Sequence, residues 1–109
     1  MLACAADVSG KWAGKTRMSI SGRIEEDTMF LTLKQEGARV TGTAGPTQEQ
    51  QAAIRNGKIE EDRVTFELPV PNGIFVFDVR LAGDRLKGTL IANAQGQEFH
   101  ATIEAARSK

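Results

Sequence analysis

Three short segments of the chain resemble one another, and their even spacing is the feature that most constrains the fold. They read G-A-R-V-T-G-T-A at 37–44, E-D-R-V-T-F-E-L at 61–68 and G-D-R-L-K-G-T-L at 83–90, so that a unit recurs after about 23 residues. Apolar residues alternate with polar ones on both sides of each Gly or Asp pair, which is typical of a β-hairpin with a short turn. The repeat therefore predicts three consecutive hairpins with tight turns at 36–39, 60–63 and 82–85.

One further strand is expected at each end of this array. Residues 8–20 place Trp12, Met18 and Ile20 on one face, and residues 97–105 place Phe99, Ala101 and Ile103 on one face. Eight sequential antiparallel strands with one apolar face close most simply into a barrel without free edges. We therefore predict an all-β fold, an eight-stranded antiparallel up-and-down (meander) barrel. Four longer connections should lie together at the end opposite the tight turns, at 21–27, 45–51, 69–73 and 93–96.

The totals limit the classes of function. A chain of 109 residues suits one domain, here 7–109. Its 14 basic and 14 acidic residues give zero net charge, which argues against a dedicated nucleic-acid binder. No apolar run approaches the about 20 residues that span a membrane.

Residues 1–6 differ from the rest of the chain. The segment A-C-A-A that includes Cys4 is typical of the end of a secretory signal peptide. We expect an exported protein, periplasmic or secreted, with residues 1–6 as the remnant of the signal or an added start. Two alternatives stay open: Cys4 as a lipoprotein anchor, and a plain N-terminus.

The single Trp of the chain stands near the start of the first expected strand, in Gly10-Lys11-Trp12. Together with D-V-S-G-K-W, R-V-T-G-T and G-D-R-L-K-G-T, this motif resembles small secreted bacterial lipocalin-like domains of the calycin type. The resemblance covers nearly the whole chain. It implies that Trp12 closes the bottom of a lipocalin- or streptavidin-like barrel and that an Arg after the last strand, here Arg107, packs over the indole.

Pairing across the tight turns indicates which side chains point inward. Leu81 should face Leu86, Val79 should face Gly88, and Leu33 should face Gly42. Near the mouth the interior should be lined by apolar residues that either hold one small ligand or fill the space themselves. These candidate ligand-binding residues are Met18, Met29, Ile54, Leu68, Phe75, Leu90 and Phe99.

The sequence offers no constellation for catalysis, a metal or a cofactor. His100, the sole His, falls on the outward face of its strand, where no shielded nucleophile would meet it. The carboxylates at 25–27 and 60–62 are expected at turns, pointing in different directions. No Gly-rich phosphate loop precedes a helix. We therefore expect a protein that is not an enzyme and binds no cofactor.

Two hypotheses for function follow. The first is a non-enzymatic exported barrel that binds a small apolar or amphiphilic molecule at a loop-rich mouth. The alternative is a filled barrel that acts as an interaction or assembly module, such as a homodimer, through an apolar strand face. The candidate interface is formed by outward-pointing apolar residues: Phe30, Ile74, Val76 and Ile91.

Overall fold

The structure is a computed structural model that describes residues 8–20, 22–71, 73–94 and 96–108. The predicted segment at residues 1–6, with Cys4, lies outside the described residues. The described chain is all-β and folds into nine strands. They are β1 (Gly10–Ile20), β2 (Arg23–Glu36), β3 (Arg39–Gly45), β4 (Ala52–Ala53), β5 (Arg55–Glu60), β6 (Arg63–Val70), β7 (Gly73–Ala82), β8 (Arg85–Ala94) and β9 (Gln97–Arg107).

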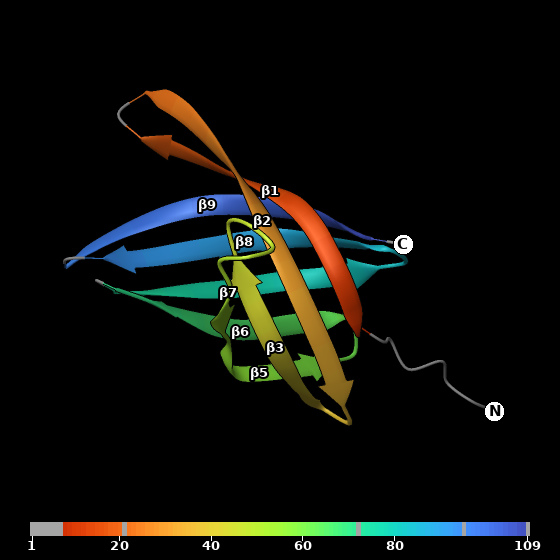
Figure 1. Cartoon of the computed structure of the whole chain (residues 1–109). Coiled ribbons are helices and arrows are strands. Elements are labelled where there is room, and N and C mark those ends of the chain that lie inside the picture. Colours follow the sequence, from red (N-terminus) through yellow and green to blue (C-terminus); the bar gives the residue numbers. More distant parts are fainter. Residues whose placement is uncertain (1–7, 21, 72, 95, 109) are drawn as a thin grey trace.

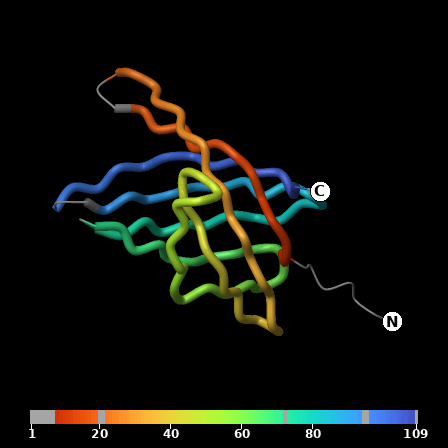
Figure 2. Tube along the Cα trace, viewed as in Figure 1, coloured from red at the N-terminus to blue at the C-terminus, as the bar shows by residue number. Residues whose placement is uncertain are grey.

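These strands close into the predicted eight-stranded antiparallel up-and-down barrel (Figures 1 and 2). Neighbours along the sequence pair with one another, β9 pairs with β1, and the β2–β3 pairing completes the circuit. The two-residue strand β4 and strand β5 follow each other against β3 and together form the fourth strand of the barrel. Ile54 separates β4 from β5. The register of β5 against β6 shifts between Arg55 and Lys58.

The predicted register of the hairpins is confirmed. Leu81 pairs with Leu86, Val79 with Gly88, and Leu33 with Gly42. Gly42 has a φ of 144°, and a Cβ built on it would lie 1.9 Å from the backbone oxygen of Thr32. Only glycine fits where β2 and β3 approach this closely.

Three of the four long connections predicted from the sequence are wrong. Residues 23–27 belong to β2, residues 69, 70 and 73 belong to strands, and residues 93, 94 and 97 extend β8 and β9. The run R-I-E-E-D is polar on both faces because this part of β2 is exposed throughout, so the alternation that reveals a half-buried strand is missing. Of the four connections, only 46–51 is a loop of several residues in the part of the chain that the structure describes, so the mouth is less rich in loops than expected.

One hairpin projects beyond the barrel. The pairing of β1 with β9 ends at Met18, and β3 meets β2 only from Phe30 onward. Residues 19–20 and 23–28, the hairpin arm, are thus paired within the hairpin alone and extend away from the neighbouring strands (Figure 1). Because the arm and β9 separate beyond Met18, residues 97–100 of β9 have no partner in β1.

The barrel interior is filled with apolar side chains from every long strand. Phe66 and Phe77 stack at its centre, with ring centroids 4.6 Å apart. Near the tight-turn end the interior is formed by buried apolar side chains, namely Trp12, Leu33, Val40, Ile59, Val64, Val79, Leu81, Leu86 and Ile103. In the described residues there is no helix, hence none long and apolar enough to cross a membrane.

Candidate functional site

Trp12 lies at the closed end of the barrel, next to the last residue of β9. It pairs with Arg107 across β1 and β9, and the Arg107 guanidinium carbon lies 4.4 Å from the centroid of the indole. The indole nitrogen donates a hydrogen bond of 2.9 Å to the carbonyl of Val8. Arg107 also donates to the Asp84 carboxylate at 3.0 Å and to the carbonyl of Ser9. The stacking expected from the G-x-W resemblance is therefore present in the structure.

Gln35 ties the segment before β1 to this closed end. The Val8 amide donates to the Gln35 side-chain oxygen at 3.0 Å, and the Gln35 amide donates to the Ser9 hydroxyl at 2.9 Å. Val8 is fully buried. The closed end is thus sealed by a polar network around an apolar plug, which leaves the opposite end as the candidate entrance.

The predicted mouth residues divide into two groups. Four of them, Met29, Ile54, Leu68 and Leu90, are buried in the core. Met18, Phe75 and Phe99 are only half-buried. Phe75 and Phe99 both pair with the buried Ala92 of β8, so the three side chains share the inner face of adjacent strands. Met18 pairs with Ala101, one inward position further along β9.

The hairpin arm borders these half-buried side chains. Met18 pairs with Glu25, and Thr16 pairs with Asp27, so both carboxylates continue the inner face of β2 beyond Met29. Both are exposed, and within the described part of the chain neither carboxylate takes part in an ion pair. The open end thus combines an apolar floor with an acidic border.

Loop 46–51 does not lie free above the mouth. The Gln51 side chain accepts from the Thr43 hydroxyl at 2.9 Å and donates to the Phe30 carbonyl at 3.2 Å. The Thr28 hydroxyl donates to the carbonyl of Pro46 at 3.0 Å. These bonds hold the loop against β2 and β3.

The predicted outer patch is brought together only in part. Val76 and Ile91 are directly opposite on β7 and β8, as expected, and Ile74 lies two residues from Val76. All three are half-buried. Phe30 lies apart on β2, because β1 and β9 stand between β2 and β8 in the sheet.

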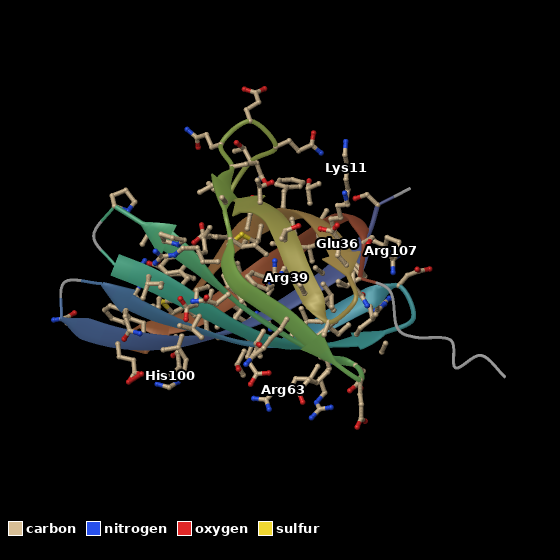
Figure 3. The ribbon with its side chains drawn as sticks, turned by 90° about the horizontal axis from the view of Figure 1, so that it is seen from below. Lys11, Glu36, Arg39, Arg63, His100 and Arg107 are labelled. Atoms are coloured by element: carbon tan, nitrogen blue, oxygen red, sulfur yellow. The ribbon has the colours of Figure 1, made fainter. Side chains whose placement is uncertain are left out.

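Polar side chains show no grouping suited to catalysis or to a metal. His100 points outward from the barrel wall (Figure 3), and its nearest acidic partner is Glu98 at 3.8 Å. Asp62, at the turn after β5, pairs with Arg80 at 2.8 Å. No three His, Cys, Asp or Glu side chains among the described residues are grouped to hold a metal ion.

Comparisons with known proteins give the fold alone. No family model and no curated protein matches the chain. Among solved structures, the chain is similar to the crystal structure of Rv2717c from M. tuberculosis, with a TM-score of 0.56 and 17% sequence identity. The match covers 94% of this chain and 93% of that one, so the likeness extends over the whole barrel.

Proposed function

We propose that the barrel binds one small apolar or amphiphilic molecule at its open end, without catalysing a reaction. The observation that carries this proposal is the set of three inward-facing apolar side chains, Met18, Phe75 and Phe99, that remain half-buried above a filled core. They lie where the β1–β2 hairpin leaves β9. A ligand would complete their burial.

The filled interior limits how deep such a ligand can sit. Below the half-buried residues, Phe66 and Phe77 are stacked and almost inaccessible to solvent. Covering about 200 Å² of apolar surface is worth about 5 kcal/mol. That energy corresponds to a dissociation constant of about 0.2 mM before the cost of association is subtracted. We therefore expect weak binding in a shallow seat.

Nuclear magnetic resonance of methyl-labelled methionine suits a weak ligand. The chain has three Met residues, and two of them, Met18 and Met29, face the open end. With 1-octanol as a neutral amphiphilic probe, we expect a saturable shift of the Met18 methyl resonance. Phe75→Ala should weaken binding severalfold, whereas Val76→Ala, the next residue on the same strand but on its outer face, should leave it unchanged. No saturable Met18 shift in the wild type would overturn the proposal.

A second candidate function rests on the outer pair Val76 and Ile91, which are directly opposite and half-buried. Such a pair could join two copies or another protein. Its extent is limited by neighbours: Glu67 pairs with Val76, and His100 pairs with Ile91. A stable interface needs about 800 Å² from each partner, so this patch is the weaker candidate. Analytical ultracentrifugation of the wild type and of the same Val76→Ala variant tests this second function. A dimer that forms in the wild type and is lost in the variant would favour an interaction role.

The finer identity of the barrel is also a proposal. We propose a lipocalin-like protein of the calycin type, supported by the Gly10-Lys11-Trp12 motif and by Arg107 stacked on Trp12. Export to the periplasm or the exterior is proposed on the sequence around Cys4.

A further inference from the structure

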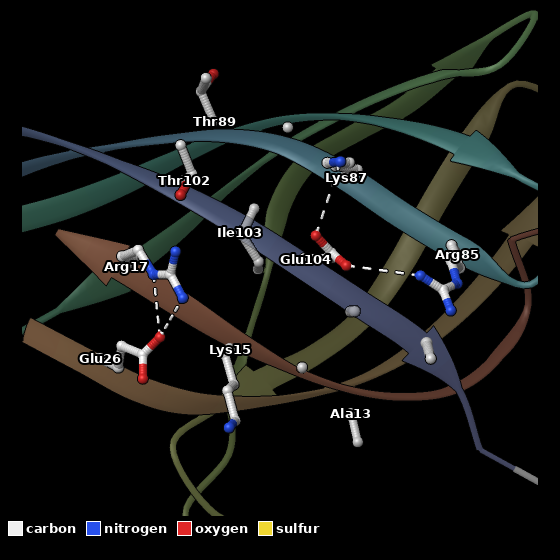
Figure 4. A pocket seen from close by; sticks show the side chains of 14 residues that line it. Ala13, Lys15, Arg17, Glu26, Arg85, Lys87, Thr89, Thr102, Ile103 and Glu104 are labelled. Carbon is white, nitrogen blue, oxygen red and sulfur yellow. Dashed lines mark hydrogen bonds and ion pairs between the residues drawn. The ribbon is translucent and has the colours of Figure 1, made fainter.

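The outside of the barrel carries a concave surface that the proposed function does not use. It has a volume of about 740 Å³, spreads over β8, β9 and β1, and reaches Glu26 of β2 (Figure 4). We call it the outer groove. Its charged lining residues are Lys15, Arg17, Glu26, Arg85, Lys87 and Glu104.

The strand register explains why this surface is concave. The central strand β9 contributes the short side chains of Ala106 and Thr102, which pair with Ala13 and Arg17 of β1 on one side. On the other side they pair with Arg85 and Thr89 of β8. Gly14 and Gly88, without side chains, also line the groove. Long basic side chains therefore rise from β8 and β1 on either side of β9, whose outward side chains in the groove are short apart from that of Glu104.

Positive charge is in excess in the outer groove, although the whole chain is neutral. Arg85 and Lys87 share one carboxylate, that of Glu104, at 3.7 and 3.8 Å. Lys15 is exposed and makes no ion pair within the described part of the chain. Arg17 is the exception, because Glu26 lies 2.6 Å from it. Among the described residues, Arg85, Lys87 and Lys15 thus have no close carboxylate of their own.

The distance between the basic side chains of β8 and those of β1 indicates what size of ligand can contact both. Neighbouring strands lie about 4.8 Å apart, so β8 and β1, with β9 between them, are about 10 Å apart. A single anionic group reaches one side only, whereas a chain of linked anionic groups reaches both. The hydroxyls of Thr89 and Thr102 line the floor as donors, and no aromatic ring is among the lining residues to stack on a base.

We propose that the outer groove binds a small oligophosphate anion, with Lys15 and Lys87 contacting phosphate groups from opposite sides. Each phosphate group offers several acceptor oxygens and at least one negative charge, which suits mixed ammonium, guanidinium and hydroxyl donors. The Glu104 carboxylate lies between Lys87 and Lys15 on the sheet, so it competes with the ligand. This inference does not depend on the proposed function, because the groove and the mouth lie on opposite faces of the barrel wall.

Calorimetric titration with tripolyphosphate at about 0.02 M ionic strength, where screening is weak, tests the proposal. Replacing both Lys15 and Lys87 with Ala should weaken binding by about tenfold. The matched control replaces Lys34 and Lys58 with Ala; these lysines are also exposed but lie on β2 and β5. This control also removes two positive charges, but outside the groove. It should therefore change the affinity for tripolyphosphate by less than about twofold.

A change in the opposite direction gives an independent check. Glu104→Gln removes the competing carboxylate and should tighten tripolyphosphate binding by about threefold. Equal losses in the two double-lysine variants would mean diffuse attraction and would overturn the proposal. So would an absence of binding in the wild type, or citrate binding as tightly as tripolyphosphate, since the assignment is to phosphate.

Discussion

Arg107 connects three parts of the closed end, which makes it the residue with the largest expected effect among the surface cations. It stacks on Trp12, pairs with Asp84 and donates to the Ser9 carbonyl. Its side chain is 27% exposed, whereas Arg80 in its pair with Asp62 is 65% exposed. We expect Arg107→Ala to lower the free energy of unfolding by about 2 kcal/mol, because a stacked guanidinium and a partly buried hydrogen bond are lost together.

Urea unfolding followed by circular dichroism measures this loss, with Arg80→Ala as the control. The control should cost less than about 1 kcal/mol, since an exposed ion pair contributes little. Arg107→Lys should recover only part of the stability, because an ammonium cannot lie flat on the indole. Equal costs for Arg107→Ala and Arg80→Ala would contradict the role assigned to the closed end.

At the scale of elements, the ion pair between β6 and β7 predicts a dependence on pH. Arg63 donates to Asp78 at 3.0 and 2.7 Å, and this bonding lowers the pKa of Asp78 although partial burial opposes it. A lowered pKa stabilises the fold above the unfolded value, about 3.9 for Asp, and this stability is lost as pH falls through the folded value.

The test compares the free energy of unfolding of wild type and Asp78→Asn between about pH 5 and pH 2. The wild type should lose more stability over this window, by a modest amount because both side chains are about half exposed. Arg63→Gln should remove most of the same dependence, although Arg80 still attracts the Asp78 carboxylate. The double variant should show the same pH dependence as Asp78→Asn. An unchanged slope in Asp78→Asn would show that the pair does not stabilise the fold.

The elements also show which parts of the fold could be read from the sequence. The hairpins were predictable because one face of each is buried. Alternation of apolar and polar residues therefore indicated both the strands and their register, as in the pairing of β7 with β8, where Leu81 lies opposite Leu86 near the turn. The arm was not, because Arg23–Thr28 is exposed on both faces and its letters resemble a loop. Phe66 follows the same alternation as Val64 and Leu68, and all three are buried, so the inward direction of this side chain is readable from the sequence.

The site was less predictable than the fold, for a physical reason. The alternation of apolar and polar residues predicts which mouth residues point inward. How much of each side chain is buried depends on the residue at which β1 and β9 cease to pair, and no local sequence pattern indicates that residue. The outer groove illustrates the same limit. The outward direction of Lys15 and Arg17 was readable from the sequence, whereas their place opposite Arg85 and Lys87 required the strand order across β9.

At the scale of the whole molecule, the barrel is closed most weakly between β3 and β5. Their register has a single pair, Arg39↔Lys58, and β3 makes two further pairs with the short β4, Thr43↔Ala53 and Ala44↔Ala52. Backbone hydrogen bonds from Ile54 to Gly42 at 3.0 Å and from Ile59 to Ala38, in the turn before β3, at 2.9 Å complete this junction. In contrast, β7 and β8 are paired along their full length. We expect unfolding to begin by opening of this β3–β5 junction.

A disulfide across the junction tests that expectation. Directly opposite residues in antiparallel strands lie about 5 Å apart at Cα, which suits a disulfide. In a Cys4→Ser background, Arg39→Cys with Lys58→Cys closes a loop of about 20 residues and should add about 3 kcal/mol of stability. If the junction opens first, the oxidised protein should also unfold at least about tenfold more slowly in urea, because the cross-link holds contacts that are lost before the barrier.

The control places a disulfide where the wall is already continuous, with Arg80→Cys and Lys87→Cys, which also pair directly. Its loop is shorter, and β7 and β8 should still be joined when the barrier is crossed, so its unfolding rate should change by less than about threefold. Equal slowing by the two disulfides would mean that the barrel opens without a preferred junction. The difference between the two unfolding rates therefore measures whether the barrel loses the pairing at the β3–β5 junction before the rest of its wall.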